Sequence, residues 1–82
     1  MKDGNENEHS QNYVEIIVNG DPYKIHRGHQ TVPEIKTAGK VSLVDKLEQV
    51  LNGELVPLDD NGSIVIKGGE EFKSHVPSGG AS

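Results

Sequence analysis

The stretch that decides the fold is Tyr13–Arg27, which reads YVEIIVNGDPYKIHR. Its first part, Tyr13–Asn19, is dense in β-branched and aromatic residues, as is typical of a strand. Asn19-Gly20-Asp21-Pro22 has the composition of a tight turn, because Gly tolerates positive φ and Pro fixes its own φ. Apolar and polar residues then alternate in Tyr23–Arg27. The sequence therefore predicts a β-hairpin, and its first strand has one face made of Val14, Ile16 and Val18.

A short helix is expected next, from about Val32 to Ala38, after Gly28-His29-Gln30 breaks the strand pattern. Thr31-Val32-Pro33-Glu34 has Thr and Glu at the spacing of a capping box, and Pro in the first turn, where its missing N–H is harmless. Gly39 is expected to end the helix at the C′ position. Such a short helix is stable only when it packs on the hairpin, through Val32, Ile35 and Ala38.

Two interpretations remain open for residues 42–58. A helix is indicated by the apolar stripe Leu43, Val44, Leu47, Val50 and Leu51, with Asn52-Gly53 as its C-cap. A hairpin is indicated by the same Asn-Gly pair between two apolar runs. In that case Glu54–Leu58 is the return strand, with Val50 facing Leu55 and Leu47 facing Leu58. The local pattern does not separate the two.

The remaining elements are short. Turns are expected at Asp59–Gly62 and Lys67–Glu70, around the β-branched run Ser63–Ile66. Glu71–Val76 is expected to be the last strand, and one face of it would carry Phe72, Ser74 and Val76. Pro77 ends the pairing of that strand because it has no N–H to donate.

The composition fits one small domain of 82 residues. We expect the domain at residues 12–77, a disordered lead-in at 1–11 and a flexible tail at 78–82. The chain has no cysteine, which excludes disulfides and thiolate chemistry and fits a cytoplasmic location. It carries 13 Asp and Glu against 8 Lys and Arg, a net charge of −5, which argues against nucleic acid or an anionic membrane as partner.

No catalytic or metal site is expected. His26 and His29 lie three residues apart but lack further ligands at a known spacing. Asp59–Gly62 lacks the alternating ligands of a calcium loop, and no serine has the context of a nucleophile. The sequence predicts a substrate, carrier or binding module without a cofactor, and no enzyme.

The most distinctive functional signal is Ser78-Gly79-Gly80-Ala81-Ser82. A Gly-Gly pair has no side chains, so it can thread a narrow channel and bring a carboxylate to an enzyme. The same composition is also typical of a frayed terminus or a cloning remnant.

The order of these elements resembles the ubiquitin-like β-grasp. More narrowly, it resembles the multiubiquitin-type domains and single ubiquitin-like modifiers of bacterial conjugation operons. The resemblance spans about Tyr13 to Gly80 and is carried by Ile17–Gly20, Thr31–Gly39, the hairpin about Asn52-Gly53, and Val65–Phe72. It implies an α+β fold, in which a mixed four- to five-stranded sheet packs on one short helix. It also favours the hairpin for Lys46–Leu58.

In that family an activating enzyme adenylates the C-terminal glycine with ATP, and a conjugating enzyme receives it as a thioester and joins it to target proteins. The resemblance makes Gly80 the reactive carboxylate and Gly79 its neighbour in the channel. Ala81 and Ser82 would be an extension that a processing peptidase removes, and some such operons are associated with antiviral defence. Val76, Pro77 and Ser78 would be presented to these enzymes. They lack the basic residues that precede the glycines of ubiquitin, so the cognate activating enzyme must read them differently.

Two other functions stay open on the same fold. In a sulfur carrier, Gly80 would become a thiocarboxylate, although carriers usually end at the second glycine. In a non-covalent interaction module, the glycines would be incidental and an exposed face of the sheet would bind a partner.

Overall fold

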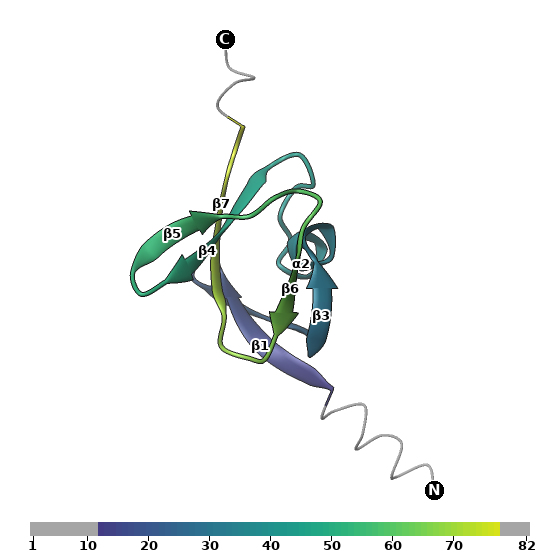
Figure 1. The fold of residues 1–82 in the computed structure, drawn as a ribbon. Helices are drawn as coiled ribbons and strands as arrows, with labels where there is room; N and C mark the ends of the chain where they lie inside the picture. Colours follow the sequence, from purple (N-terminus) through teal and green to yellow (C-terminus); the bar gives the residue numbers. More distant parts are fainter. Residues whose placement is uncertain (1–11, 78–82) are drawn as a thin grey trace, which may run out of the picture.

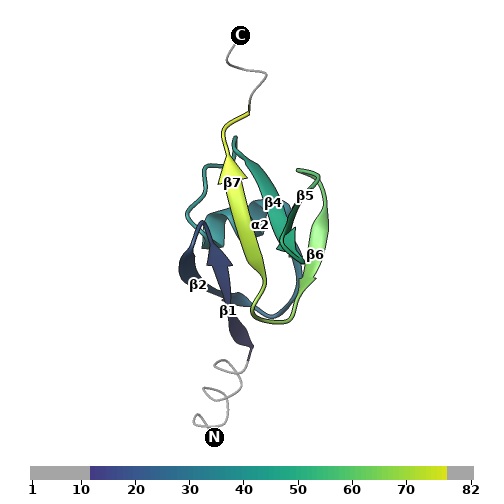
Figure 2. The ribbon, with the colours of Figure 1, turned by 90° about the vertical axis from the view of Figure 1, so that its left-hand side faces the viewer.

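The computed structural model describes residues 12–77, which form an α+β domain (Figure 1). The elements are β1 (Tyr13–Val18), β2 (Asp21–His26), β3 (Gly28–Thr31), α2 (Val32–Ala38), β4 (Lys46–Leu51), β5 (Glu54–Pro57), β6 (Ser63–Ile66) and β7 (Glu71–His75). Five strands form a mixed sheet in the order β2-β1-β7-β4-β5, and β3 pairs with β6 in a second, two-stranded sheet. Helix α2 lies behind the larger sheet when β7 faces the viewer (Figure 2).

The predicted N-terminal hairpin is confirmed, and its turn is tighter than expected. Asn19 and Gly20 have φ of 53° and 88°, the positive values that a two-residue type I′ turn requires. Only these two residues form the turn, so β2 begins at Asp21 and not at Tyr23. Pro22 can pair with Ile17 because β2 is an edge strand, where a missing N–H faces away from the sheet.

The ambiguous stretch is a hairpin, and the helical interpretation is wrong. β4 and β5 pair with Val50 opposite Leu55, and the N–H of Leu58 donates to the carbonyl of Leu47 at 3.0 Å. Asn52 and Gly53 form the turn, with φ of 53° and 81°. Leu43 and Val44, which the helical stripe placed on a buried face, are exposed in the loop before β4.

Helix α2 has the predicted bounds and the predicted capping box. The Thr31 hydroxyl accepts from the N–H of Glu34, and a Glu34 carboxylate oxygen accepts from the N–H of Thr31. Val32 and Ile35 are buried and Ala38 is partly buried. The helix therefore begins on a local signal and is held by the core.

The C-terminus of α2 differs from the prediction, because Gly39 is the C-cap with φ of −91° and the left-handed C′ residue is Lys40, with φ of 59°. The N–H groups of Lys40 and Val41 donate to the carbonyls of Thr37 (3.2 Å) and Lys36 (2.8 Å), which is the Schellman pattern. Gly39 is needed for space, since a Cβ there would lie 2.7 Å from Val18 Cγ2.

Lys40→Gly is expected to stabilise the protein by about 0.5–1 kcal/mol. A left-handed conformation costs a residue with a Cβ about 1–2 kcal/mol, and the greater freedom of Gly in the unfolded chain offsets part of the gain. Urea unfolding should show a higher midpoint at unchanged slope. Lys40→Ala keeps the Cβ and should give no comparable gain, so equal midpoints for Lys40→Gly and the parent would contradict this explanation.

The prediction that Gly28-His29-Gln30 only interrupts the strand pattern is wrong. Residues 28–31 form β3, which pairs antiparallel with β6 from Gly28 opposite Ile66 to Thr31 opposite Ser63. The small sheet this creates contributes Ile66 to the core. A strand of Gly, His, Gln and Thr has little local propensity, so it forms because a distant partner pairs with it.

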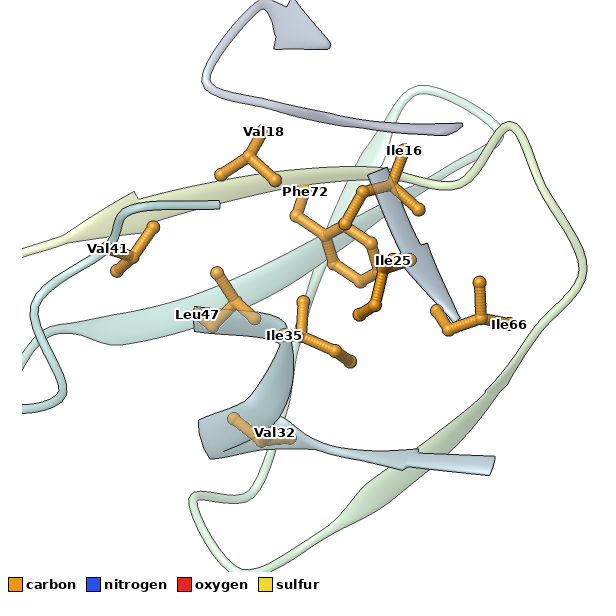
Figure 3. Packing of buried hydrophobic residues seen from close by; sticks show 9 residues of the cluster. All are labelled: Ile16, Val18, Ile25, Val32, Ile35, Val41, Leu47, Ile66 and Phe72. Carbon is orange, nitrogen blue, oxygen red and sulfur yellow. The ribbon is translucent and has the colours of Figure 1, made fainter. Parts of the chain in front are cut away.

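Phe72 occupies the centre of the core. It is fully buried, and Figure 3 shows its ring among Ile16, Ile25 and Ile35, contributed by β1, β2 and α2. Ser74 is half-buried at the same parity on β7, whereas Val76 lies beyond the end of the strand and is exposed, contrary to the prediction. The core thus fixes β7 through Phe72, three residues before the strand ends at His75.

Candidate functional site

Strand β7 carries the chain toward its Gly-Gly motif, and its end is held by a side chain of the first hairpin. Ser74 donates its N–H to Asn19 Oδ1 at 3.0 Å, and Asn19 Nδ2 donates to the Ser74 hydroxyl at 2.9 Å. β1 pairs with β7 in parallel only up to Val18 and Phe72. The Asn19 side chain therefore continues the support of β7 after the β1 backbone has turned away.

Beyond Ser74 the chain is held on one side only, by β4. His75 pairs with Lys46 across the strands, and its Nδ1 lies 3.5 Å from Glu48 Oε1. Val76 follows, exposed to solvent, and Pro77 is partly buried. Of the predicted site residues these two are described. Ser78, Gly79, Gly80, Ala81 and Ser82 lie outside the described residues, as does the expected lead-in at 1–11.

A buried lysine supports the loop beside this end of the domain. Lys36 is only 2% exposed, and its Nζ donates to the carbonyl of Leu43 at 3.2 Å and to Asp60 Oδ1 at 3.3 Å. The ammonium thus ties α2 to the loop before β4 and to the turn at residues 59–62. The sequence analysis missed it. The signal was available, since Lys36 lies four residues after Val32 and shares its helix face.

Asp60 is the counterion of two lysines. Lys46 Nζ lies 3.1 Å from Asp60 Oδ2, and Lys36 Nζ approaches the other oxygen. These hydrogen bonds hold the pKa of the Asp60 carboxyl below its usual value of 3.8, and the bond from Lys46 contributes more than the bond from Lys36. The expected turn at residues 59–62 is present, with the N–H of Gly62 donating to the carbonyl of Asp59. Its Asp60 side chain forms salt bridges with Lys36 and Lys46.

The remaining candidates are separated by the fold. The His26 ring stacks against Tyr13 with centroids 4.1 Å apart, whereas His29 Nε2 lies 3.0 Å from the Ser63 hydroxyl on β6. Gly68 and Gly69 have positive φ in a loop, where the Glu70 carboxylate accepts from the N–H groups of Lys67 and Gly68.

No group of His, Cys, Asp and Glu side chains within residues 12–77 could hold a metal ion. The helix of that part of the chain is too short and too polar to cross a membrane.

Comparison of the chain with models of known protein families, with curated proteins and with solved structures gave no match.

Proposed function

We propose that this protein is a ubiquitin-like modifier of the β-grasp type, whose Gly80 carboxyl group is activated and joined to target proteins. Ala81 and Ser82 are first removed when a peptidase hydrolyses the Gly80–Ala81 amide with water. The protein itself is a substrate and not an enzyme.

The observation that carries the proposal is the way β7 leads to the Gly-Gly motif. β7 is the central strand of the sheet, pinned at Phe72 by the core and at Ser74 by Asn19. Gly80 follows the last hydrogen-bonded strand residues at a short, fixed distance along the chain. A rigid body followed by a short segment with two glycines suits a carboxylate that enters a narrow active site. The mixed sheet with one short helix is also compatible with a β-grasp.

The chemistry proceeds by four substitutions. A carboxylate oxygen of Gly80 attacks the α-phosphorus of ATP, and pyrophosphate leaves with the electron pair of the broken P–O bond. A thiolate of the activating enzyme then attacks the acyl carbon and releases AMP, and a thiolate of the conjugating enzyme takes over the acyl group. Finally an amine of the target attacks the thioester, the thiolate leaves, and the amine proton passes to a base.

The proposal is tested by the intact mass of the protein after expression together with the genes that flank its own. We expect a chain ending at Gly80 and a series of heavier covalent species. With Gly80→Ala the heavier species should disappear, because the channel and the acyl centre are built for glycine. Lys73→Ala, an exposed change on β7, should leave both results intact.

Other outcomes would identify the alternatives. A chain ending at Gly80 that gains one sulfur in exchange for one oxygen would indicate a sulfur carrier. An unprocessed chain without heavier species, and full activity of Gly80→Ala, would overturn the proposal and favour a non-covalent interaction module.

A further inference from the structure

The most exposed large apolar side chains of the described residues gather at one end of the domain. Val44 is 73% exposed, Val76 69% and Leu43 61%. Lys46 and His75 pair across β4 and β7, so the loop that precedes β4 lies beside the residues that follow β7. Figure 2 shows this loop at the end toward which β7 points. We call Leu43, Val44 and Val76 the exit patch.

The loop that carries the exit patch is constrained by hydrogen bonds. The Leu43 carbonyl accepts from the buried Lys36 ammonium. The N–H of Asp45 donates to the carbonyl of Ser42 at 3.0 Å, and the N–H of Val44 lies 3.4 Å from the Ser42 hydroxyl. Leu43 and Val44 therefore face solvent on a backbone that is held in place, which lowers the entropic cost of binding a partner there.

The outer face of β7 and the backbone edges of the sheet are less suited to an apolar partner, and the exposed apolar side chains of the β4–β5 hairpin (Leu51, Leu55 and Val56) are each less exposed than those of the exit patch. The face of β7 opposite the core carries Glu71, Lys73 and His75, which alternate with the inward Phe72 and Ser74. The two edges of the sheet are β2 and β5, and each holds a proline, Pro22 and Pro57. The N–H of Ile17 donates to the carbonyl of Glu70, away from β2, so Ile17 and Pro22 form a pair without hydrogen bonds between them. The nitrogen of Pro22 therefore faces the outer edge of the sheet. A proline on the outer edge has no N–H to donate to an added strand.

The distance to Gly80 then decides what must lie against the patch. Gly80 is four residues beyond Val76, and a fully extended chain covers at most about 14 Å over four residues. A stable protein interface buries about 800 Å² on each partner, so it extends over a comparable distance. An enzyme that holds the Gly80 carboxylate against ATP is therefore expected to contact the loop of Leu43 and Val44.

We propose that the exit patch is the docking surface for the adenylating enzyme that takes Gly80, and that this enzyme presents an apolar surface beside the mouth of its channel. This inference rests on the proposed function. The patch adds binding energy outside the reacting group, so it controls how well the enzyme captures the protein and not the rate once it is bound.

The experiment is an ATP–pyrophosphate exchange assay with the purified adenylating enzyme and the chain ending at Gly80. We expect Leu43→Ser combined with Val44→Ser to lower kcat/KM by about 10- to 100-fold, mainly through a higher KM. Leu55→Ser and Val65→Ser are matched controls, because both side chains are 54% exposed and lie on other strands. They should leave kcat/KM within about twofold, and thermal unfolding should verify that all variants are folded.

The possible outcomes separate this inference from the function on which it rests. Normal exchange by the Leu43/Val44 variant, or an equal loss in the controls, would overturn the docking surface and leave the modifier intact. A synthetic peptide of residues 76–80 with the same kcat/KM as the folded protein would also overturn the docking surface and leave the modifier function intact. No exchange with the parent protein would overturn both.

Discussion

Phe72→Ala is expected to lower the free energy of unfolding by about 3–5 kcal/mol, the usual cost of deleting a buried phenylalanine. Phe72 is fully buried, and its ring packs among residues of β1, β2 and α2 (Figure 3). A domain of this size has a total stability of only about 4–12 kcal/mol. Thermal unfolding should therefore shift down by more than about 12 °C.

The control for Phe72→Ala lies next to it on the same strand. Lys73 is exposed on the opposite face of β7, so Lys73→Ala should change stability by less than about 0.5 kcal/mol. Phe72→Leu, which keeps most of the apolar volume, should fall between the two. A loss below about 1 kcal/mol for Phe72→Ala would contradict the central position of this ring.

Lys36→Ala is expected to cost about 2–4 kcal/mol. The side chain is 2% exposed, so its removal leaves a cavity where the methylene groups packed, and it releases the Leu43 carbonyl from its donor. Lys36→Met keeps most of the volume and removes the charge together with the hydrogen bonds to Leu43 and Asp60. Because Asp60 is half-exposed and still paired with Lys46, this variant should stay within about 1 kcal/mol of the parent at neutral pH. Urea unfolding measures both, and equal losses would show that the ammonium with its hydrogen bonds matters, and not the packing of the methylene groups.

The same pair of variants gives a pH dependence with a defined sign. The pKa of Asp60 is lowered in the folded state, so its pairing stabilises the protein above the unfolded pKa and is lost as the pH falls through the lower folded value. Once Asp60 is protonated, the parent protein retains the buried Lys36 cation without its charged partner. Lys36→Met lacks that cation and should lose less stability on acidification. A larger loss in Lys36→Met would contradict the assigned pairing.

The sequence was sufficient wherever a structure is set by neighbouring residues. Asn19-Gly20 and Asn52-Gly53 specify two-residue turns, because both residues adopt positive φ there. Thr31 and Glu34 specify the start of α2 through a capping box. The five-stranded sheet also agrees with the upper limit of the expected strand number.

Tertiary contacts explain the remainder. β3 forms only because β6 pairs with it, and the two strands are separated by α2 and by the β4–β5 hairpin. Leu43 and Val44 have the spacing of a buried helical stripe, yet both are exposed in a loop. Their position beside the end of β7 follows only from the register between β4 and β7. The helix spacing places Lys36 on the face of Val32, but no local pattern connects it to Asp60, its charged partner 24 residues later.

The position of β7 also determines when the protein can fold during its synthesis. β7 lies between β1 and β4, so it joins the two hairpins into a single sheet, yet it follows all the other described strands in the chain. Until residue 75 has left the ribosome, the nascent chain has two hairpins with no strand between them and no Phe72 to fill the core. Folding must therefore wait for the last strand, and an interrupted chain remains open to proteases. A folded copy is therefore also a copy whose synthesis has passed residue 75.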